Sequence, residues 1–198
     1  MPWKNAYTVS DEKSMADSAI AWPGGARCCV NIVVNLSLAA GPGGIRPDDL
    51  RGSDAYFSMH EGLDAVLKTL DRHNFKATFA IPAVIAAVYP AQIRAIVAAG
   101  HEVAAQGLTH EDVSQLSRSE EKKRLAETTQ ILGNITGNRP AGWFSLPRTG
   151  DKFAVGTISD STMDLLIEGG YGYMGNSLAD DIPHYWVTDF DSKRAILA

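Results

Sequence analysis

The chain has 198 residues, of which 45% are hydrophobic and 21% charged, and its formal net charge is −5. This balance excludes a disordered chain, and an acidic charge with scattered lysines and arginines argues against a nucleic-acid partner. Apolar runs stay short of the roughly 18 residues of a membrane span, and charged residues lie where a signal peptide would be apolar, so we expect a cytoplasmic protein without a membrane partner.

Residues 1–25 are expected to form an N-terminal arm that ends in a turn at Trp22–Gly25. The near-continuous apolar run at residues 27–38 predicts a buried strand of a parallel sheet. We interpret its adjacent cysteines, Cys28 and Cys29, as small hydrophobic strand residues, because neighbouring residues form a disulfide only with strain. The long glycine- and proline-rich connection at residues 39–53 predicts a lid or substrate loop.

From residue 54 onward, helical and strand patterns alternate. Ser117 and Glu120 form a capping box that opens one helix, which Gly137 ends, and Ser159 is expected to cap a later helix. Helices are predicted at residues 54–74, 90–99, 118–136 and 160–168, and strands at residues 76–82, 101–106, 141–145, 171–176, 184–190 and 193–198.

This alternation predicts an α/β fold with a parallel sheet and leaves two architectures, an open doubly wound sheet or a (β/α) barrel. The chain ends within an apolar strand, residues 194–198, and is shorter than the roughly 250 residues typical of a barrel. We therefore expect residues 26–198 to form one domain whose C-terminal part is missing or is supplied by another chain. An open sheet edge also predicts a homo-oligomer or a complementing chain.

Polar residues follow several of the predicted strands, and the carboxyl ends of parallel strands meet at one edge of a sheet. His110, Glu111 and Asp112 suit metal binding or acid–base chemistry, or alternatively the cap of a short helix. Several further residues have two interpretations each. Arg148 contacts an anionic or carbonyl ligand or is solvated, and Asp180 and Asp181 form a carboxylate pair or a turn. Trp143 belongs to a special site, or it packs in the core or a pocket wall. The polar residues at the remaining strand ends are Asn35, Ser37, Gln106, Ser145 and Asn176.

Three segments resemble one known family. Residues 56–82 contain Lys-Ala-Thr-Phe, residues 100–112 contain Gly-His-Glu followed by His110, and residues 139–143 read Arg-Pro-Ala-Gly-Trp, with a related stretch at 159–181. Together they are similar to the polysaccharide deacetylase family (NodB homology, carbohydrate esterase 4-like). The branch that they resemble contains peptidoglycan deacetylase-like and allantoinase-like hydrolases.

The resemblance implies a distorted (β/α) barrel of seven strands that hydrolyses an amide, most often the N-acetyl group of a sugar. It also implies a divalent metal ion, zinc, held by one aspartate and two histidines, with a carboxylate as base and a late histidine as acid. Such a cation lowers the pKa of its bound water and polarises the carbonyl group.

The sequence departs from this pattern at the metal ligands. Asn35 lies in the segment that should offer the aspartate, Gln106 replaces the first histidine, and His110 alone remains. We therefore expect a hydrolase of non-peptide carbon–nitrogen bonds that binds zinc weakly or not at all. His110, Asn35 and Gln106 are its expected catalytic residues, and the expected substrate-binding residues are Arg148, Trp143, Asp180, Asp181 and Ser37. The alternatives are an inactive relative that serves as a binding or assembly module, or an inactivated variant of an active enzyme.

Overall fold

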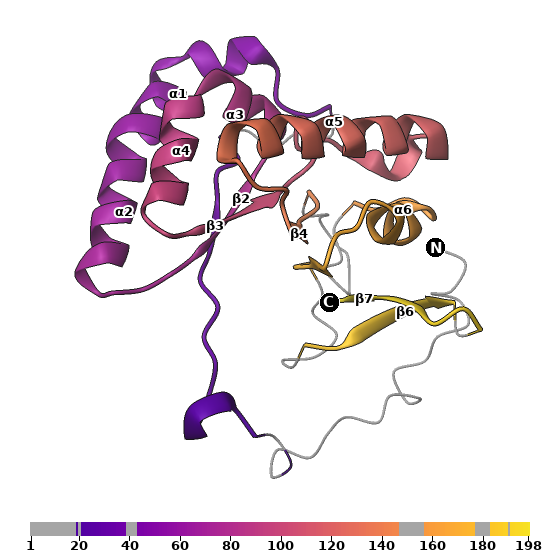
Figure 1. The fold of residues 1–198 in the computed structure, drawn as a ribbon. Coiled ribbons are helices and arrows are strands. Elements are labelled where there is room, and N and C mark those ends of the chain that lie inside the picture. Colours follow the sequence, from indigo (N-terminus) through magenta and orange to yellow (C-terminus); the bar gives the residue numbers. More distant parts are fainter. Residues whose placement is uncertain (1–18, 20, 39–42, 147–156, 177–182, 190) are drawn as a thin grey trace.

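A computed structural model describes residues 19, 21–38, 43–146, 157–176, 183–189 and 191–198 of the chain. Over these residues seven strands form one sheet in the order β1-β2-β3-β4-β5-β7-β6 (Figure 1). Neighbours from β1 to β7 pair in parallel, and β6 pairs with β7 in the antiparallel direction. The strands are β1 (Val33–Asn35), β2 (Thr78–Ile81), β3 (Glu102–Ala105), β4 (Gly142–Trp143), β5 (Tyr173–Met174), β6 (Tyr185–Asp189) and β7 (Arg194–Leu197).

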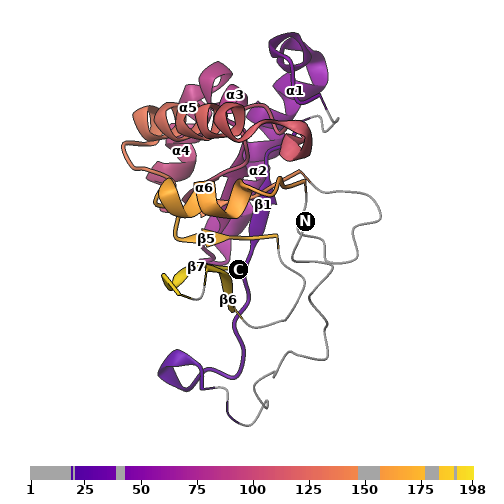
Figure 2. The same ribbon diagram turned by 90° about the vertical axis from the view of Figure 1, so that its right-hand side faces the viewer.

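The helices connect successive strands and lie along one side of them in Figure 1, and Figure 2 shows the same layering from the side. They are α1 (Ser53–Phe57), a π-helical turn (Ser58–Gly62), α2 (Leu63–Arg72), α3 (Ala83–Val88), α4 (Pro90–Ala98), α5 (Arg118–Thr136) and α6 (Thr162–Glu168), with 3-10 turns at Pro23–Gly25, Pro47–Arg51 and Val113–Gln115. Among the described residues, no helix is both long and apolar enough to cross a membrane.

Successive residues of each strand point to opposite faces of the sheet, and the two faces differ. Phe79 and Ile81 of β2 are fully buried in the large core that the helices cover. Ala80, between them, belongs to a second and smaller cluster with Ala104 and Phe144. The face away from the main core therefore carries small side chains on β2 and β3, next to the aromatic Phe144.

The predicted α/β class and parallel sheet are confirmed, as is Ser117 as the N-cap of α5; the Glu120 carboxylate binds Arg124 instead of closing a capping box. The Ser117 hydroxyl accepts a hydrogen bond from the backbone N–H of Glu120 at 3.3 Å, and α5 ends at Gly137, whose φ is +78°. The structure also contains α3, which was not predicted. The N-cap of α6 is Ser161 rather than Ser159, although the Ser159 hydroxyl accepts the Ser161 N–H at 2.9 Å.

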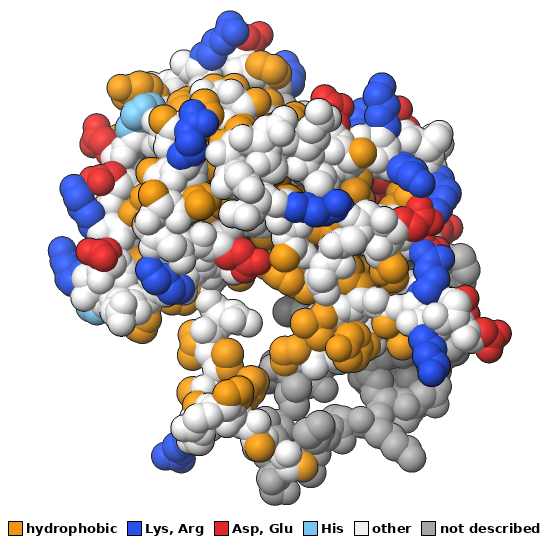
Figure 3. All heavy atoms as spheres, viewed as in Figure 1, with side chains coloured by type: hydrophobic (Ala, Val, Ile, Leu, Met, Phe, Trp, Pro, Cys, Tyr) orange, Lys and Arg blue, Asp and Glu red, His pale blue; other side chains and the backbone are white. Residues whose placement is uncertain are grey.

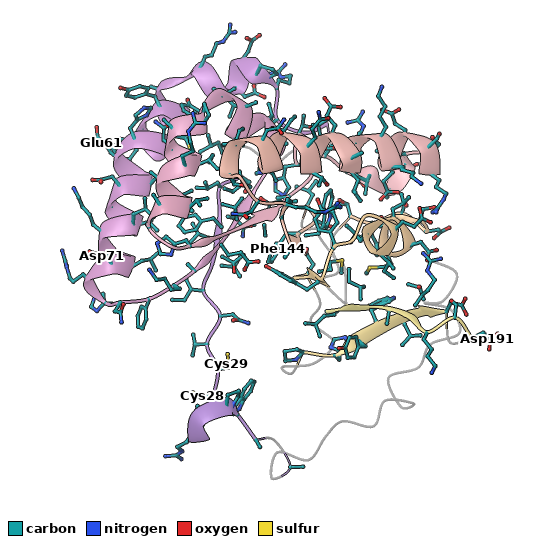
Figure 4. All side chains as sticks on the ribbon, in the orientation of Figure 1. Cys28, Cys29, Glu61, Asp71, Phe144 and Asp191 are labelled. Atoms are coloured by element: carbon teal, nitrogen blue, oxygen red, sulfur yellow. The ribbon has the colours of Figure 1, made fainter. Side chains whose placement is uncertain are left out.

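The predicted strand at residues 27–38 is wrong in length and burial. Only Val33–Asn35 form β1, while residues 26–31 are exposed and extend away from the sheet (Figure 1). Cys28 and Cys29, labelled in Figure 4, are exposed free thiols rather than buried strand residues. Among the described residues β1 pairs only with β2, and pairing begins where Thr78 N–H donates to Ile32 O at 2.9 Å. An apolar segment becomes a strand only where a neighbouring backbone is present to bind it.

Replacing Gly137 by alanine is expected to lower the free energy of unfolding by about 1 kcal/mol, because its positive φ is unfavourable for a residue with a β-carbon. No other atom lies within 4 Å of the position that this β-carbon would take, so the cost comes from the backbone alone. Gly133→Ala, inside the same helix, is the matched control and is expected to stabilise the protein by up to about 1 kcal/mol. Chemical denaturation of both variants checks the opposite signs.

A buried carboxylate joins α5 to the start of α6. Glu121 is 4% exposed, and its carboxylate accepts hydrogen bonds from the hydroxyls of Ser159 and Thr162. Burial raises the pKa of the Glu121 carboxyl, although the two hydrogen bonds and the charge of Arg118 oppose that shift. The folded protein therefore holds this proton more tightly than the unfolded chain does.

The contribution of Glu121 to stability is thus largest at acidic pH and is lost as the pH rises through its raised pKa. We expect Glu121→Gln to remove this part of the pH dependence and to raise the melting temperature more at pH 7 than at pH 4.5, relative to the unmodified protein. Thermal unfolding across this range measures the effect. Glu127→Gln, at an exposed position of the same helix, is the control, and an equal response of both variants would contradict the assignment.

Candidate functional site

The polar residues that follow β1 and β3 meet at the carboxyl edge of the sheet. The Gln106 side chain donates a hydrogen bond from Nε2 to Oδ1 of Asn35 at 2.7 Å. Strand β2 lies between them, with Ala80 in register with both Asn35 and Ala104. Because Ala80 carries only a methyl group, the Gln106 side chain can cross β2 and reach Asn35. The structure therefore brings these two predicted site residues into contact.

This pair is neutral and has hydrogen-bonding capacity left over. Gln106 is 2% exposed, and its Oε1 atom is buried without a hydrogen-bond partner. Asn35 is exposed, and its Nδ2 group is a hydrogen-bond donor that this contact does not use. An unused acceptor and an unused donor on adjacent amides complement the N–H and C=O groups of another amide.

His110 lies in the loop that follows β3 and is also 2% exposed. Neither of its ring nitrogens has a hydrogen-bond partner, and its φ is +60°. Burial lowers the pKa of the His110 imidazole, and the negative charge of Glu111 opposes this shift in part. The ring is therefore neutral at pH 7, with one nitrogen able to accept a proton and the other able to donate one.

Backbone hydrogen bonds from the first turn of α3 hold the loop that carries His110. The N–H groups of Ala83 and Val84 donate to the carbonyl oxygens of Gly107 and Leu108 at 3.0 and 2.9 Å. Helix starts have unsatisfied N–H groups, and here the loop supplies their acceptors. The unpredicted helix α3 thus has a direct part in building the site.

The two acidic residues after His110 have structural partners. The Glu111 carboxylate accepts hydrogen bonds from Thr109 and contacts Arg124 of α5 at 3.3 Å. Asp112 is the N-cap of the turn Val113–Gln115 and accepts the Ser114 N–H at 2.8 Å. The helix-cap interpretation of Asp112 is confirmed. Within the part of the chain that the structure describes, no three or more His, Cys, Asp or Glu side chains gather in a group able to hold a metal ion.

The family that the sequence motifs resemble generally uses a divalent metal ion, and the residues at this site do not fit one. Zinc prefers imidazole, thiolate and carboxylate ligands. Asn35 and Gln106 are amides that bind each other, and His110 is left as a single imidazole donor. The groups that this site offers to a ligand are therefore hydrogen-bond donors and acceptors.

Two further strand ends are joined by Asn176, to which the sequence alone assigned no role. Its Oδ1 accepts the Ser145 N–H at 2.6 Å, and its Nδ2 donates to the Ser145 carbonyl at 3.3 Å. The hydroxyls of Ser145 and Thr157 are buried without partners, and Thr157 N–H donates to the carbonyl oxygen of Leu146 at 2.8 Å. The position of Ser145 and Asn176 after β4 and β5 was the available signal in the sequence.

The remaining predicted residues are placed as follows. Ser37 is partly exposed, two residues beyond Asn35. Trp143 is 6% exposed and packs edge-on against Tyr171, with ring centroids 5.5 Å apart, as the core interpretation expects. Its neighbour Phe144, labelled in Figure 4, belongs instead to the small cluster on the other face. Arg148, Asp180 and Asp181 lie outside the described residues.

Surface charge on the face drawn in Figure 3 is mixed, with lysines and arginines interspersed among aspartates and glutamates. Glu168 of α6 forms ion pairs with Arg118 and Lys122 of α5. This face shows no extended basic surface of the type that binds nucleic acid.

The polysaccharide deacetylase family model matches residues 48–171. The chain therefore belongs to the polysaccharide deacetylase family, in agreement with the resemblance seen in its motifs. It is 27% identical over 150 residues to a peptidoglycan deacetylase of Helicobacter pylori, a match that covers 76% of this chain and 48% of that protein. The chain thus spans about half the length of this curated relative.

Solved structures share the fold. A candidate polysaccharide deacetylase from Mycobacterium smegmatis has a TM-score of 0.74 at 23% identity, over 90% of this chain and 60% of that one. Puue allantoinase has a TM-score of 0.67 at 27% identity, over 89% of this chain and 62% of that one. A Bacillus anthracis protein described as a pseudoenzyme of the CE4 family has a TM-score of 0.54 at 19% identity, over 73% of this chain and 41% of that one.

Proposed function

We propose that this chain binds and hydrolyses a non-peptide carbon–nitrogen bond, in an N-acetylated sugar or a cyclic amide, by means of neutral groups. The observation that carries the proposal is the buried His110 ring, whose two nitrogens lack partners in the loop directly after the Gln106–Asn35 pair. Its membership in a deacetylase family supports an amide substrate. Similarity to a peptidoglycan deacetylase supports the sugar, and similarity to an allantoinase supports the cyclic amide.

In the proposed reaction, Gln106 Oε1 accepts the N–H of the substrate amide and Asn35 Nδ2 donates to its carbonyl oxygen. The neutral His110 imidazole takes a proton from the water that attacks the carbonyl carbon. The same proton then passes to the substrate nitrogen as the carbon–nitrogen bond breaks, which releases a carboxylic acid and an amine. A neutral imidazole that accepts and then returns a proton in this way acts as a general acid–base catalyst.

His110→Ala is expected to lower kcat by at least about 100-fold, because general acid–base groups contribute roughly 100- to 10,000-fold. The assay uses N-acetylglucosamine oligomers and allantoin as alternative substrates, with EDTA present in one series and zinc in another. His73→Ala, at an exposed histidine stacked on Phe75, is the control and should keep full activity. Equal turnover by the His110 and His73 variants would contradict the proposed role.

A second candidate function is binding of such an amide without hydrolysis. The presence of the amides Asn35 and Gln106, in place of the family's aspartate and histidine ligands, favours this candidate. Calorimetric binding of the same oligomers, together with no hydrolysis by the unmodified protein under any metal condition, would support this candidate over the first. Hydrolysis in EDTA that His110→Ala abolishes would support the first.

A further inference from the structure

We propose that Glu111 is a positioning residue, which acts with Arg124 to hold the His110 ring in its buried orientation. The part of this inference that concerns turnover rests on the proposed function, whereas the part that concerns ring placement does not. The observations that carry it are the backbone conformation of His110, the contacts of the Glu111 carboxylate and the closure of the surrounding loop.

The backbone of His110 is held in an unfavourable conformation. Its φ of +60° lies in the left-handed region, which residues with a β-carbon rarely adopt. Such conformations persist where the surrounding structure determines them, and they are frequent at functional sites. The contacts that determine this one should therefore be close to His110 in space.

Glu111 supplies those contacts on one side of the loop. Its Oε2 atom accepts two hydrogen bonds from Thr109, from the backbone N–H at 2.7 Å and from the hydroxyl at 2.9 Å. The Glu111 side chain thus links the positions on either side of His110, residues 111 and 109. Because the Glu111 side chain is only 6% exposed, water does not compete strongly for these bonds.

The segment that precedes the 3-10 turn Pro47–Arg51 contacts the other side of Thr109. Ile45 N–H donates to Thr109 O at 2.7 Å, and a β-carbon added to Gly44 would lie 2.2 Å from the Thr109 hydroxyl oxygen. Thr109 is therefore fixed between Gly44 and Glu111. A movement of the backbone that carries His110 would therefore break the bonds that Glu111 makes with Thr109.

Arg124 ties this arrangement to the helix layer. Its Nη1 group contacts Glu111 Oε1 at 3.3 Å, while its Nε group contacts Glu120 Oε1 at the same distance. The first contact joins α5 to the His110 loop, and the second is an i, i+4 pair within α5. Exposed pairs within a helix contribute little to stability, so Glu120 provides a matched control for Glu111.

The test measures the ring of His110 directly. In protein labelled with 15N-histidine, the ring signals of His110 are assigned by their loss in His110→Asn and recorded at one pH in Glu111→Ala, Glu111→Gln, Arg124→Met and Glu120→Gln. Glu111→Ala is expected to shift and broaden the His110 signals. Glu111→Gln keeps an acceptor for Thr109, so its His110 signals should lie closer to those of the unmodified protein. Arg124→Met is expected to change the His110 signals by an intermediate amount. Glu120→Gln is expected to leave them unchanged.

Where turnover is measurable, Glu111→Ala should lower kcat by roughly 10- to 100-fold with little change in KM, because small displacements of a reacting group have effects of this size. Unchanged His110 signals in both Glu111→Ala and Arg124→Met would overturn the positioning role. If Glu111→Ala does not fold, Glu111→Gln and Arg124→Met still decide the matter. Shifted His110 signals in a protein that hydrolyses no amide would leave the positioning role intact and would reject the proposed function alone.

Discussion

Changing Asn35 to aspartate and Gln106 to histidine in one variant is expected to raise zinc affinity by at least about 100-fold. Residues that only support metal ligands alter metal affinity by about 10- to 100-fold, and direct ligands should have a larger effect. The two side chains already touch, at 2.7 Å, so both substitutions fall within one site. They would replace two neutral amides by a carboxylate and an imidazole, which zinc prefers. His110 is the expected third ligand, because its ring nitrogens have no competing partner.

Titration with zinc against a competing chelator measures this affinity. Asn31→Asp combined with Gln106→His is the matched control, because Asn31 lies in the exposed segment before β1, four residues from Asn35. Adding His110→Ala to the Asn35 and Gln106 variant should remove most of the gain. Equal zinc affinity of the test and control variants would show that Asn35 and Gln106 do not belong to a common ligand set.

Phe79→Ala is expected to lower the free energy of unfolding by about 3–5 kcal/mol, the usual range for an aromatic residue deleted from a core. Phe79 is fully buried at the centre of β2, and its ring lies 5.3 Å from that of His101. Strand β2 separates β1 from β3, so a cavity here also weakens the support of the Gln106–Asn35 contact.

Phe75→Ala serves as the control for this substitution, because Phe75 is 54% exposed and lies just before β2. Its expected cost is below about 1 kcal/mol, as for surface substitutions in general. Urea denaturation of the two variants under the same conditions measures the difference. Equal destabilisation would contradict the central position assigned to Phe79.

Much of the fold could be predicted from local patterns. Helix α5 has a serine cap and a terminating glycine, and it begins and ends within a residue of the predicted limits. By contrast, only three residues of the strand predicted at residues 27–38 form β1. The length of a strand depends on how much neighbouring backbone is present to pair with it. Helix α3 was missed because its short, uniformly apolar sequence has no period to recognise.

The candidate site was predictable in one respect only. Asn35 and Gln106 follow parallel strands, and that position alone indicated that they share an edge of the sheet. The sequence left open whether Glu111 binds a ligand or the protein, and whether Trp143 serves a binding site or the core. Both depend on side-chain direction, which a shift of one residue in a strand reverses.

The amino-acid sequence by itself determined the order of helices and strands, the α/β class, and the loss of charge at the expected ligand positions, because each of these follows from residue types and their local spacing. Tertiary structure alone decided that Gln106 crosses Ala80 to reach Asn35, that both His110 nitrogens stay unpartnered, and that Glu111 binds Thr109 and Arg124. These contacts join groups from separate strands, loops and helices, and their distances exist only once the chain has packed its sheet against its helices.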